Sequence, residues 1–273
     1  MECKIIAHRG ANKKAPQNTM PAFRQAVEDG ADGFETDVHL TRDGKLVICH
    51  NYAIDATSDG RGLISDYTFD ELRTFDFGSY FAPEFRGTQA PSLEEFLQLA
   101  KEARLDPINV ELKSPRAGRR MLTVKTLEAI KAAGLTDRVI ISSFDPRILR
   151  TVKCLEPACR TGFLYPCQDP RVSGFVPSAL LCARSIRADY IHPAYIVVSR
   201  ALVLAAHRLG LGVNVWTVDD PRTAAFLISC GVDGIITDCP AEVRGYAEAA
   251  AAAKKHRPAP GLLELPTAAQ DRA

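Results

Sequence analysis

The chain has 273 residues, of which 46% are hydrophobic and 25% are charged. This length suits one large domain or two small ones, and it is sufficient to bury a full hydrophobic core. Lys and Arg total 34 against 33 Asp and Glu, so the formal net charge is +1. That balance argues against a nucleic-acid partner and against a polybasic membrane-surface protein. No apolar run approaches the roughly 18 residues of a transmembrane segment.

The chain contains 8 cysteines but no C-x-x-C pair and no histidines at zinc-finger spacing. We therefore expect separate reduced thiols rather than disulfides or a zinc site. The few residues before the cluster His8-Arg9-Gly10 are too short for a secretory signal. Together these features predict a cytoplasmic protein, and they leave its oligomeric state open.

Apolar segments rich in β-branched residues recur along the chain, with helical segments between them. The predicted strands are Lys4–His8, Gly33–Val38, Pro107–Lys113, Arg138–Ser143, Arg160–Tyr165, Asp189–His192, Val213–Val218 and Gly234–Thr237. A further short segment, Lys45–His50, follows the turn signal Asp43-Gly44. We interpret it as a hairpin partner of the second strand rather than as a separate repeat.

Start and stop signals predict helices between these strands. Thr19 can cap a helix that has Pro21 in its first turn and ends before Gly30. Ser92 and Glu95 have the spacing of a capping box. Further predicted helices, each followed by a glycine, span 124–133, 199–209 and 221–230.

Repetition of the strand–helix order over about 250 residues is typical of an α/β protein of the (β/α)8 TIM-barrel class. A doubly wound open sheet is the alternative. It usually has fewer strands and an early glycine-rich phosphate loop. The chain has neither a G-x-G-x-x-G motif nor a P-loop, so the barrel is favoured.

We expect one barrel domain over residues 1–250, with a small insertion of about residues 52–90 after the second strand and its hairpin. The insertion is unusually aromatic, which predicts a packed cap rather than a solvated linker. Its aromatic residues are Tyr52, Tyr67, Phe69, Phe75, Phe77, Tyr80, Phe81 and Phe85. The Pro- and Ala-rich residues 257–273 predict a flexible tail.

Charged residues interrupt predicted strands that should be nearly continuous apolar runs if both faces are buried. Strand alternation places Glu35 and Asp37 on one face of the second strand, and Glu111 on the corresponding face of the third. If the apolar faces pack on helices, these carboxylates point into the barrel. Their uncompensated burial would cost several kcal/mol each, and a bound cation removes that cost.

Oxygen ligands alone suit one divalent cation, Mg²⁺ or Ca²⁺ with Mn²⁺ as a further candidate, better than Zn²⁺. The alternative interpretation is a solvated charged face or a structural ion-pair network with Lys113.

Other functional side chains fall at the carboxyl ends of the strands, where barrel active sites lie. His8 ends the first strand and His50 ends the hairpin strand, and both suit acid–base catalysis near neutral pH. Arg9 and Lys113 would offer positive charge to a phosphate, or else pair with the carboxylates. Trp216, late in the seventh strand, could stack on a ligand's carbon skeleton or pack in the barrel. Candidates for supporting or glycerol contacts, or for purely structural roles, are Asn18, His192 and Asp238.

Several blocks of sequence combine these residues. The early blocks are A-H-R-G at 7–10, P-Q-N-T at 16–19, G-A-D-G-F-E-T-D-V at 30–38, T-R-D-G at 41–44 and V-I-C-H at 47–50. The later blocks are N-V-E-L-K at 109–113, V-W-T-V-D at 215–219 and G-V-D-G-I-I-T-D at 231–238. From about residue 4 to residue 245, the chain resembles the glycerophosphodiester phosphodiesterase family, specifically its cytosolic bacterial-type members.

The resemblance implies a TIM barrel with an inserted cap. It also implies metal-dependent hydrolysis of a small-molecule glycerophosphodiester to sn-glycerol 3-phosphate and an alcohol. The nucleophile would be water or the substrate's own glycerol hydroxyl. The residues carried over by position are Glu35, Asp37 and Glu111 as metal ligands, His8 and His50 as the acid–base pair, and Arg9 and Lys113 as phosphate contacts.

The chain departs from the family pattern at Gln17, Asn51 and Ala56, where the family usually has Glu, Asp and Arg. The first two departures remove negative charge near the expected metal, but the five core residues remain, so we expect catalysis. One alternative is a related phosphodiesterase that acts on lysophospholipids, with the aromatic cap accepting an acyl chain. The other is a non-catalytic binder of phosphate esters, which Gln17 and Asn51 alone support.

Overall fold

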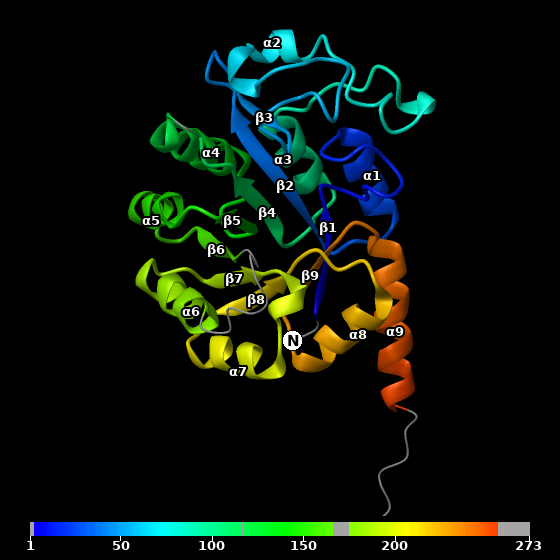
Figure 1. Cartoon of the computed structure of the whole chain (residues 1–273), viewed down its shortest axis with the longest axis vertical. Coiled ribbons are helices and arrows are strands. Elements are labelled where there is room, and N and C mark those ends of the chain that lie inside the picture. The colour runs from blue at the N-terminus through cyan, green and yellow to red at the C-terminus, as the bar shows by residue number, and fades with distance from the viewer. Residues whose placement is uncertain (1–2, 116, 166–174, 256–273) are drawn as a thin grey trace, which may run out of the picture.

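The computed structural model describes residues 3–115, 117–165 and 175–255. The tail predicted over 257–273 and one cysteine, Cys167, lie outside this part of the chain. Within it, eight parallel strands close into a barrel surrounded by helices (Figure 1). The first strand pairs in parallel with both the second and the last. The predicted (β/α)8 barrel is therefore confirmed, and the open sheet is excluded.

All eight predicted parallel strands are present, with small shifts at their ends. Their bounds are β1 Lys4–His8, β2 Gly33–Leu40, β4 Ile108–Leu112, β5 Val139–Ser143, β6 Arg160–Tyr165, β7 Tyr190–Pro193, β8 Gly212–Val215 and β9 Gly234–Thr237. The hairpin prediction is also confirmed, because β3 (Leu46–Ile48) pairs antiparallel with β2.

Helices connect the strands and cover the barrel from outside (Figure 1). The α-helices are α1 Met20–Glu28, α2 Phe69–Leu72, α3 Leu93–Glu102, α4 Arg119–Ala133, α5 Pro146–Leu155, α6 Phe175–Ser185, α7 Arg200–Arg208, α8 Pro221–Cys230 and α9 Pro240–Lys255. Single 3-10 turns are η1 Ile64–Asp66, η2 Pro83–Phe85 and η3 Tyr195–Val197. The prediction started α4 five residues too late, and it did not include α5, α6 and α9.

Two predicted helix starts differ in how they are capped. At α3 the capping box is confirmed, since the Ser92 hydroxyl accepts from the Glu95 N–H at 3.1 Å and the Glu95 carboxylate accepts from the Ser92 N–H at 2.8 Å. At α1, Thr19 is the N-cap residue, but its side chain makes no cap hydrogen bond. Its hydroxyl instead donates to the Pro16 carbonyl at 2.5 Å. Thr19 therefore fixes the loop before α1 rather than the helix itself.

The apolar faces of the strands pack outward against the helices, as alternation predicts. Phe34 of β2 contacts Phe23 of α1 and Phe96 of α3, with ring centroids 4.7–5.6 Å apart in this trio. The next two outward residues on β2, Thr36 and Val38, are both fully buried. The intervening residues of β2 consequently face the barrel interior, and two of them are carboxylates.

A repeated aspartate holds the amino-terminal end of the barrel in register. Asp32, Asp189 and Asp233 each directly precede a strand, and each carboxylate accepts the N–H of the neighbouring strand at 2.7–2.8 Å. The same aspartates pair through their own backbone N–H groups with that neighbouring strand. Each aspartate is thus bonded to the neighbouring strand through both its side chain and its backbone. These bonds fix the register of the two strands, and the register sets the height of each strand's carboxyl end, where the candidate site lies.

Residues 52–90 lie beyond the ends of β2 and β3, at the top of Figure 1. They contribute most of a second apolar cluster, separate from the barrel core, which consists of Val47, Cys49, Ile54, Ile64, Phe69, Leu72, Phe77 and Ala90. Tyr67 and Phe75 pack on it with their rings edge to face at 5.3 Å. Throughout the described residues, no helix has the length and apolar character that crossing a membrane requires.

Candidate active site

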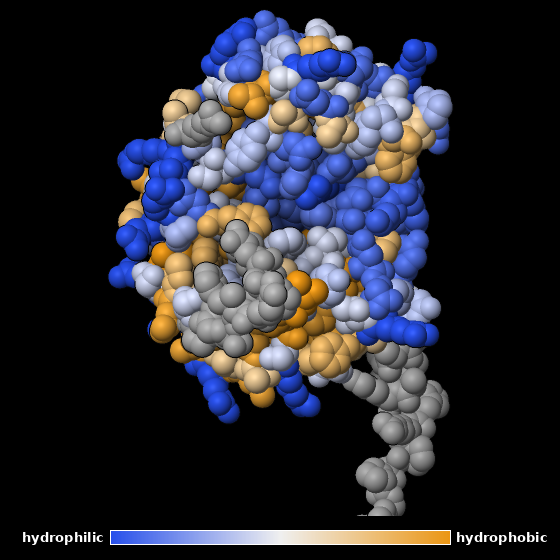
Figure 2. All heavy atoms as spheres, viewed as in Figure 1, coloured by the Kyte–Doolittle hydropathy of each residue, from blue (hydrophilic) through white to orange (hydrophobic). Residues whose placement is uncertain are grey.

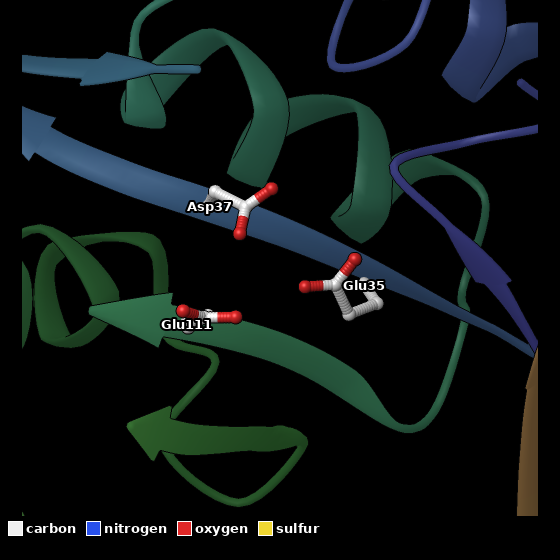
Figure 3. Close-up of side chains that lie close together, drawn as sticks. All are labelled: Glu35, Asp37 and Glu111. Atoms are coloured by element: carbon white, nitrogen blue, oxygen red, sulfur yellow. The ribbon is translucent and has the colours of Figure 1, made fainter. Parts of the chain in front are cut away.

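Three carboxylates converge at the carboxyl end of two adjacent strands. Glu35 and Asp37 are inward residues of β2, and Glu111 of β4 lies directly opposite Asp37 in the strand register. One oxygen from each of the three lies within 4.8 Å of the others, and all three side chains are buried. Figure 3 shows the carboxylates turned toward one another in the space between the two strands.

Two cations lie against this cluster. The Lys113 ammonium is 2.8 Å from Asp37 and 2.7 Å from Glu111, and the Arg9 Nε is 3.4 Å from Asp37. Burial alone would raise the pKa of Asp37, but Lys113 and Arg9 outweigh burial and lower it. Asp37 is therefore ionised in the folded protein, and it is the carboxylate that contacts both cations.

The other two carboxylates lack sufficient compensating charge. Burial, reinforced by the neighbouring charge of Asp37, raises the pKa of Glu35 well above its usual value and that of Glu111 to about 7. Both would ionise readily only with more positive charge nearby. A cluster of buried hard oxygen donors that is short of positive charge fits a divalent cation such as Mg²⁺, Ca²⁺ or Mn²⁺.

His8 is held by a carboxylate from the far end of the chain. Its Nδ1 is 2.5 Å from Asp238, which directly follows β9, and its Nε2 is 3.9 Å from Glu35. The Asn12 amide donates to both the His8 carbonyl, at 2.8 Å, and Asp238, at 2.7 Å. Burial would raise the pKa of Asp238, but the contacts with His8, Asn12 and Lys13 together outweigh burial and lower it to about 2. Asp238 thus orients the ring so that Nε2 faces the carboxylate cluster.

His50 has a neutral partner in the corresponding position. Its Nδ1 is 2.7 Å from the Asn51 amide oxygen. Burial lowers the pKa of His50 to about 4, so the ring is neutral at pH 7. Because an amide oxygen only accepts, Nδ1 carries the proton and Nε2 remains a free acceptor. The two histidines therefore differ in the group that holds Nδ1, which is a carboxylate for His8 and an amide for His50.

The loop between β1 and α1 supports the site through unusual backbone conformations. Arg9 and Asn18 have φ of 54° and 57°, and Gly10 has φ of 83°. A Cβ on Gly10 would lie 2.5 Å from the Ala22 carbonyl carbon, so only glycine allows this approach to α1. The loop directs the Asn18 amide to Asp37 at 2.8 Å.

The three departures from the family pattern have different surroundings. The Gln17 amide oxygen accepts from the Arg9 guanidinium at 2.6 Å, and Asn51 is the partner of His50. Ala56 is exposed.

A small cavity of about 70 Å³ opens beside these groups. Its lining residues are His8, Arg9, Glu35, His50, Asn109, Glu111, Lys113, Phe144, Leu164, Trp216 and Ile236. Seven of the eight residues predicted for the site line this cavity. The eighth, Asp37, belongs to the carboxylate cluster with Glu35 and Glu111, which do line it. The structure thus brings all eight together.

Several residues of this region were not predicted to line the site. Phe144, Leu164 and Ile236 supply an apolar side to the cavity. They stand directly after β5, late in β6 and within β9. Their position near strand ends was the available signal, but apolar residue types do not suggest a functional role. Asn12 was also not predicted, because a single polar residue in a loop has no pattern that indicates a role.

His192, a candidate supporting residue, is fully buried in the barrel. Its backbone carbonyl accepts from the Trp216 indole N–H at 2.7 Å. Gly162 leaves room for its ring, since a Cβ there would lie 2.5 Å from Nε2. His192 therefore supports the position of Trp216 from below and does not line the cavity.

Acidic, basic and histidine side chains gathered at the carboxyl end of a (β/α)8 barrel form a candidate active site of the TIM-barrel class. Comparison with known proteins agrees. The sequence model of the glycerophosphoryl diester phosphodiesterase family matches residues 8–242. A glycerophosphodiester phosphodiesterase of Caldanaerobacter subterraneus subsp. tengcongensis is 38% identical over 240 residues, which is 88% of this chain and 96% of that protein.

Solved structures give the same result. A phosphodiesterase of Oleispira antarctica, in complex with the product sn-glycerol-3-phosphate, superposes with a TM-score of 0.83 at 25% identity, covering 90% of this chain and 96% of that one. A glycerophosphodiester phosphodiesterase of Parabacteroides distasonis superposes with a TM-score of 0.76 at 28% identity, covering 92% and 98%. The chain belongs to the glycerophosphoryl diester phosphodiesterase family, and the prediction of an enzyme of this family is confirmed.

Proposed function

We propose that this chain hydrolyses glycerophosphodiesters to sn-glycerol 3-phosphate and an alcohol, with the help of one divalent cation. The observation that carries the proposal is the cluster of Glu35, Asp37 and Glu111, whose oxygens lie within 4.8 Å of one another beside two histidines. The product bound in the Oleispira antarctica relative supports the same substrate class.

The carboxylate cluster would hold the cation, and Arg9 and Lys113 would hold the phosphate. A cation bound there would act as a Lewis acid that withdraws charge from the phosphoryl oxygens. Arg9 can offer a forked pair of donors to a phosphate, whereas Lys113 acts as a point charge. Because Gln17 is neutral, it orients the Arg9 guanidinium without cancelling its charge.

The different partners of the two histidines suggest different roles. His50, neutral with Nε2 free, is suited to take a proton from the attacking hydroxyl, which belongs to water or to the substrate's own glycerol. The Asp238 carboxylate stabilises a protonated His8, whose Nε2–H can then protonate the leaving alkoxide. Each such proton transfer contributes roughly 10²–10⁴-fold to the rate.

The domain organisation and location belong to the same proposal. We infer a single barrel domain capped by residues 52–90, because Tyr52 of this segment donates to the Ser114 carbonyl at 2.9 Å, one residue beyond Lys113. The seven cysteines of the described residues are all unpaired, which favours a cytoplasmic location.

The test measures sn-glycerol 3-phosphate released from glycerophosphocholine, glycerophosphoethanolamine and glycerophosphoglycerol. Each substrate is tried with Mg²⁺, Ca²⁺ or Mn²⁺, and with chelator. We expect release that chelator abolishes and that Glu35→Gln lacks. The matched control is Glu128→Gln, an exposed carboxylate on α4, which should behave as wild type. Release that survives both chelator and Glu35→Gln would disprove the metal role, and no release from any substrate would disprove the activity.

A further inference from the structure

A third histidine lies beside the candidate acid–base pair, and the proposed function gives it no role. His39 follows Asp37 by two residues on β2, so the two side chains lie on the same, inward face of that strand. Only 5% of His39 is exposed to solvent. Burial of a polar ring is costly unless its nitrogens find partners. The contacts of the His39 ring therefore indicate what it does.

The ring of His39 is bonded to the main chain of His50. Its Nε2 lies 3.3 Å from the His50 carbonyl oxygen. Because a carbonyl oxygen only accepts, Nε2 carries the proton and donates it to this bond. The ring of Tyr52 packs edge to face on His39 with ring centroids 5.0 Å apart, and the Tyr52 hydroxyl is itself held by the Ser114 carbonyl at 2.9 Å. These contacts fix the orientation of the His39 ring.

The bond from His39 forms where the backbone ladder between β2 and β3 has ended. Regular pairing stops at Val38 and Ile48. One more backbone bond, from the Cys49 N–H to the Asp37 carbonyl at 3.1 Å, extends it. Within residues 3–115, 117–165 and 175–255, no backbone N–H bonds to the carbonyl of the next residue, His50. A side chain of β2 therefore replaces the backbone donor at that residue.

A protein donor matters here because water has access to this part of the barrel. Figure 2 shows hydrophilic residues in the hollow below residues 52–90. With water as its only partner, the His50 carbonyl would stay satisfied while its main chain moved, and the ring would move with it. A displacement of about 1 Å in a reacting group can cost on the order of 10²-fold in rate. A donor fixed on a strand removes that freedom.

We propose that His39 is a positioning residue, which holds the main chain of His50 so that the free Nε2 of His50 reaches the attacking hydroxyl. The inference rests on the proposed function, in which His50 takes the proton. His39 is not among the residues that line the cavity, so it acts through His50 and not on the substrate. Loss of the bond should therefore lower kcat and leave KM nearly unchanged, because the phosphate contacts stay in place.

The experiment measures kcat and KM for glycerophosphocholine, in the presence of the divalent cation that supports wild-type activity. His39→Phe keeps a ring against Tyr52 but removes the donor, and we expect kcat to fall roughly 10–10²-fold with KM within about twofold. His39→Gln places an amide N–H near the position of Nε2 and should recover most of kcat. His39→Met also lacks a donor, and it replaces His39→Phe if circular dichroism shows that the Phe variant is unfolded.

The matched control is His207→Phe, at the amino-terminal end of the barrel. The His207 side chain is 38% exposed on α7 and pairs with Asp233, so this variant should keep the wild-type kcat. Wild-type kcat in His39→Phe would overturn the inference. So would an equal loss of kcat in His39→Phe and His39→Gln, because that result indicates a packing role without a need for the donor.

A double-mutant cycle tests whether His39 acts through His50. In a His50→Ala background, His39→Phe should cause no further loss of kcat, since no ring remains to be positioned. A further loss as large as in the wild-type background would overturn the inference, because His39 would then act elsewhere. Absence of sn-glycerol 3-phosphate release by the wild type, or wild-type turnover in His50→Ala, would instead show that the proposed function is wrong.

Discussion

At the scale of single residues, the site is organised by what each histidine touches through Nδ1. His8 faces a carboxylate and His50 faces an amide. A carboxylate stabilises the imidazolium, whereas an amide oxygen leaves the ring neutral when it is buried. The two rings therefore differ in the partner that holds Nδ1 before any substrate binds, and unlike surroundings are what allows two similar groups to take acid and base roles at one pH.

This difference makes Asn51→Asp informative. The new carboxylate would favour protonated His50, so the pKa of His50 should rise from about 4, by about 1–3 units for an adjacent opposite charge. A base is inactive when it is protonated, so the acid limb of kcat/KM should move to higher pH by a similar amount. Activity at pH 6 should fall while activity above pH 8 is kept. The measurement is kcat/KM from pH 5 to pH 9.

Gln17→Glu is the matched control, because it adds the same charge to the site but next to Arg9. We expect it to raise KM by weakening the phosphate contact, with the acid limb in place. Equal shifts of the acid limb in both variants would mean that general site charge, rather than the partner of His50, governs the profile.

Residue types and alternation predicted that the eight candidate residues would lie together, because strand ends of a barrel converge at one rim, and the structure places them side by side. The partners of those residues were not all predictable. His8 and Asp238 are 230 positions apart, and only barrel closure brings β1 and β9 together. Alternation predicts on which face of a strand a side chain lies. It does not predict which residue after another strand will contact that side chain.

At the scale of elements, the strands were more predictable than the helices. The strands alternate clearly, and their outward residues pack in the core around Phe23, Phe34 and Phe96. Helix α5 was missed although Asp145 caps it and Pro146 begins it. The single turns within residues 52–90 were missed for a physical reason. Such short helices are unstable alone, so the apolar cluster beneath them rather than local propensity decides where they form.

The aspartates that precede strands are a second element-scale feature. The Asp233 carboxylate accepts from the Val213 N–H at 2.7 Å and lies 2.8 Å from His207 Nε2. Asp233→Ala leaves that backbone N–H without its partner, which should cost about 1–3 kcal/mol in the free energy of unfolding. Asp233→Asn keeps an acceptor oxygen and should cost less. Urea denaturation measures both variants, with Asp70→Ala as control, since the Asp70 side chain on α2 is exposed. A control loss as large as that of Asp233→Ala would refute the register role.

At the scale of the whole molecule, stability and the candidate metal site are linked. Three carboxylates are buried against two cations inside the barrel, so a divalent cation that binds only the folded chain should stabilise it. At 100 times the Kd the gain is about 2.7 kcal/mol, or about 5–10 °C in Tm for a chain of this size. Thermal melts with Mg²⁺, Ca²⁺ or Mn²⁺ and with chelator measure the shift. Glu35→Gln should lose most of the metal-induced shift, yet without metal it should be at least as stable as wild type, because it removes a buried carboxyl group that is costly to ionise beside Asp37. Glu128→Gln should retain the full shift, and an equal shift in wild type and Glu35→Gln would place the stabilising cation outside the barrel.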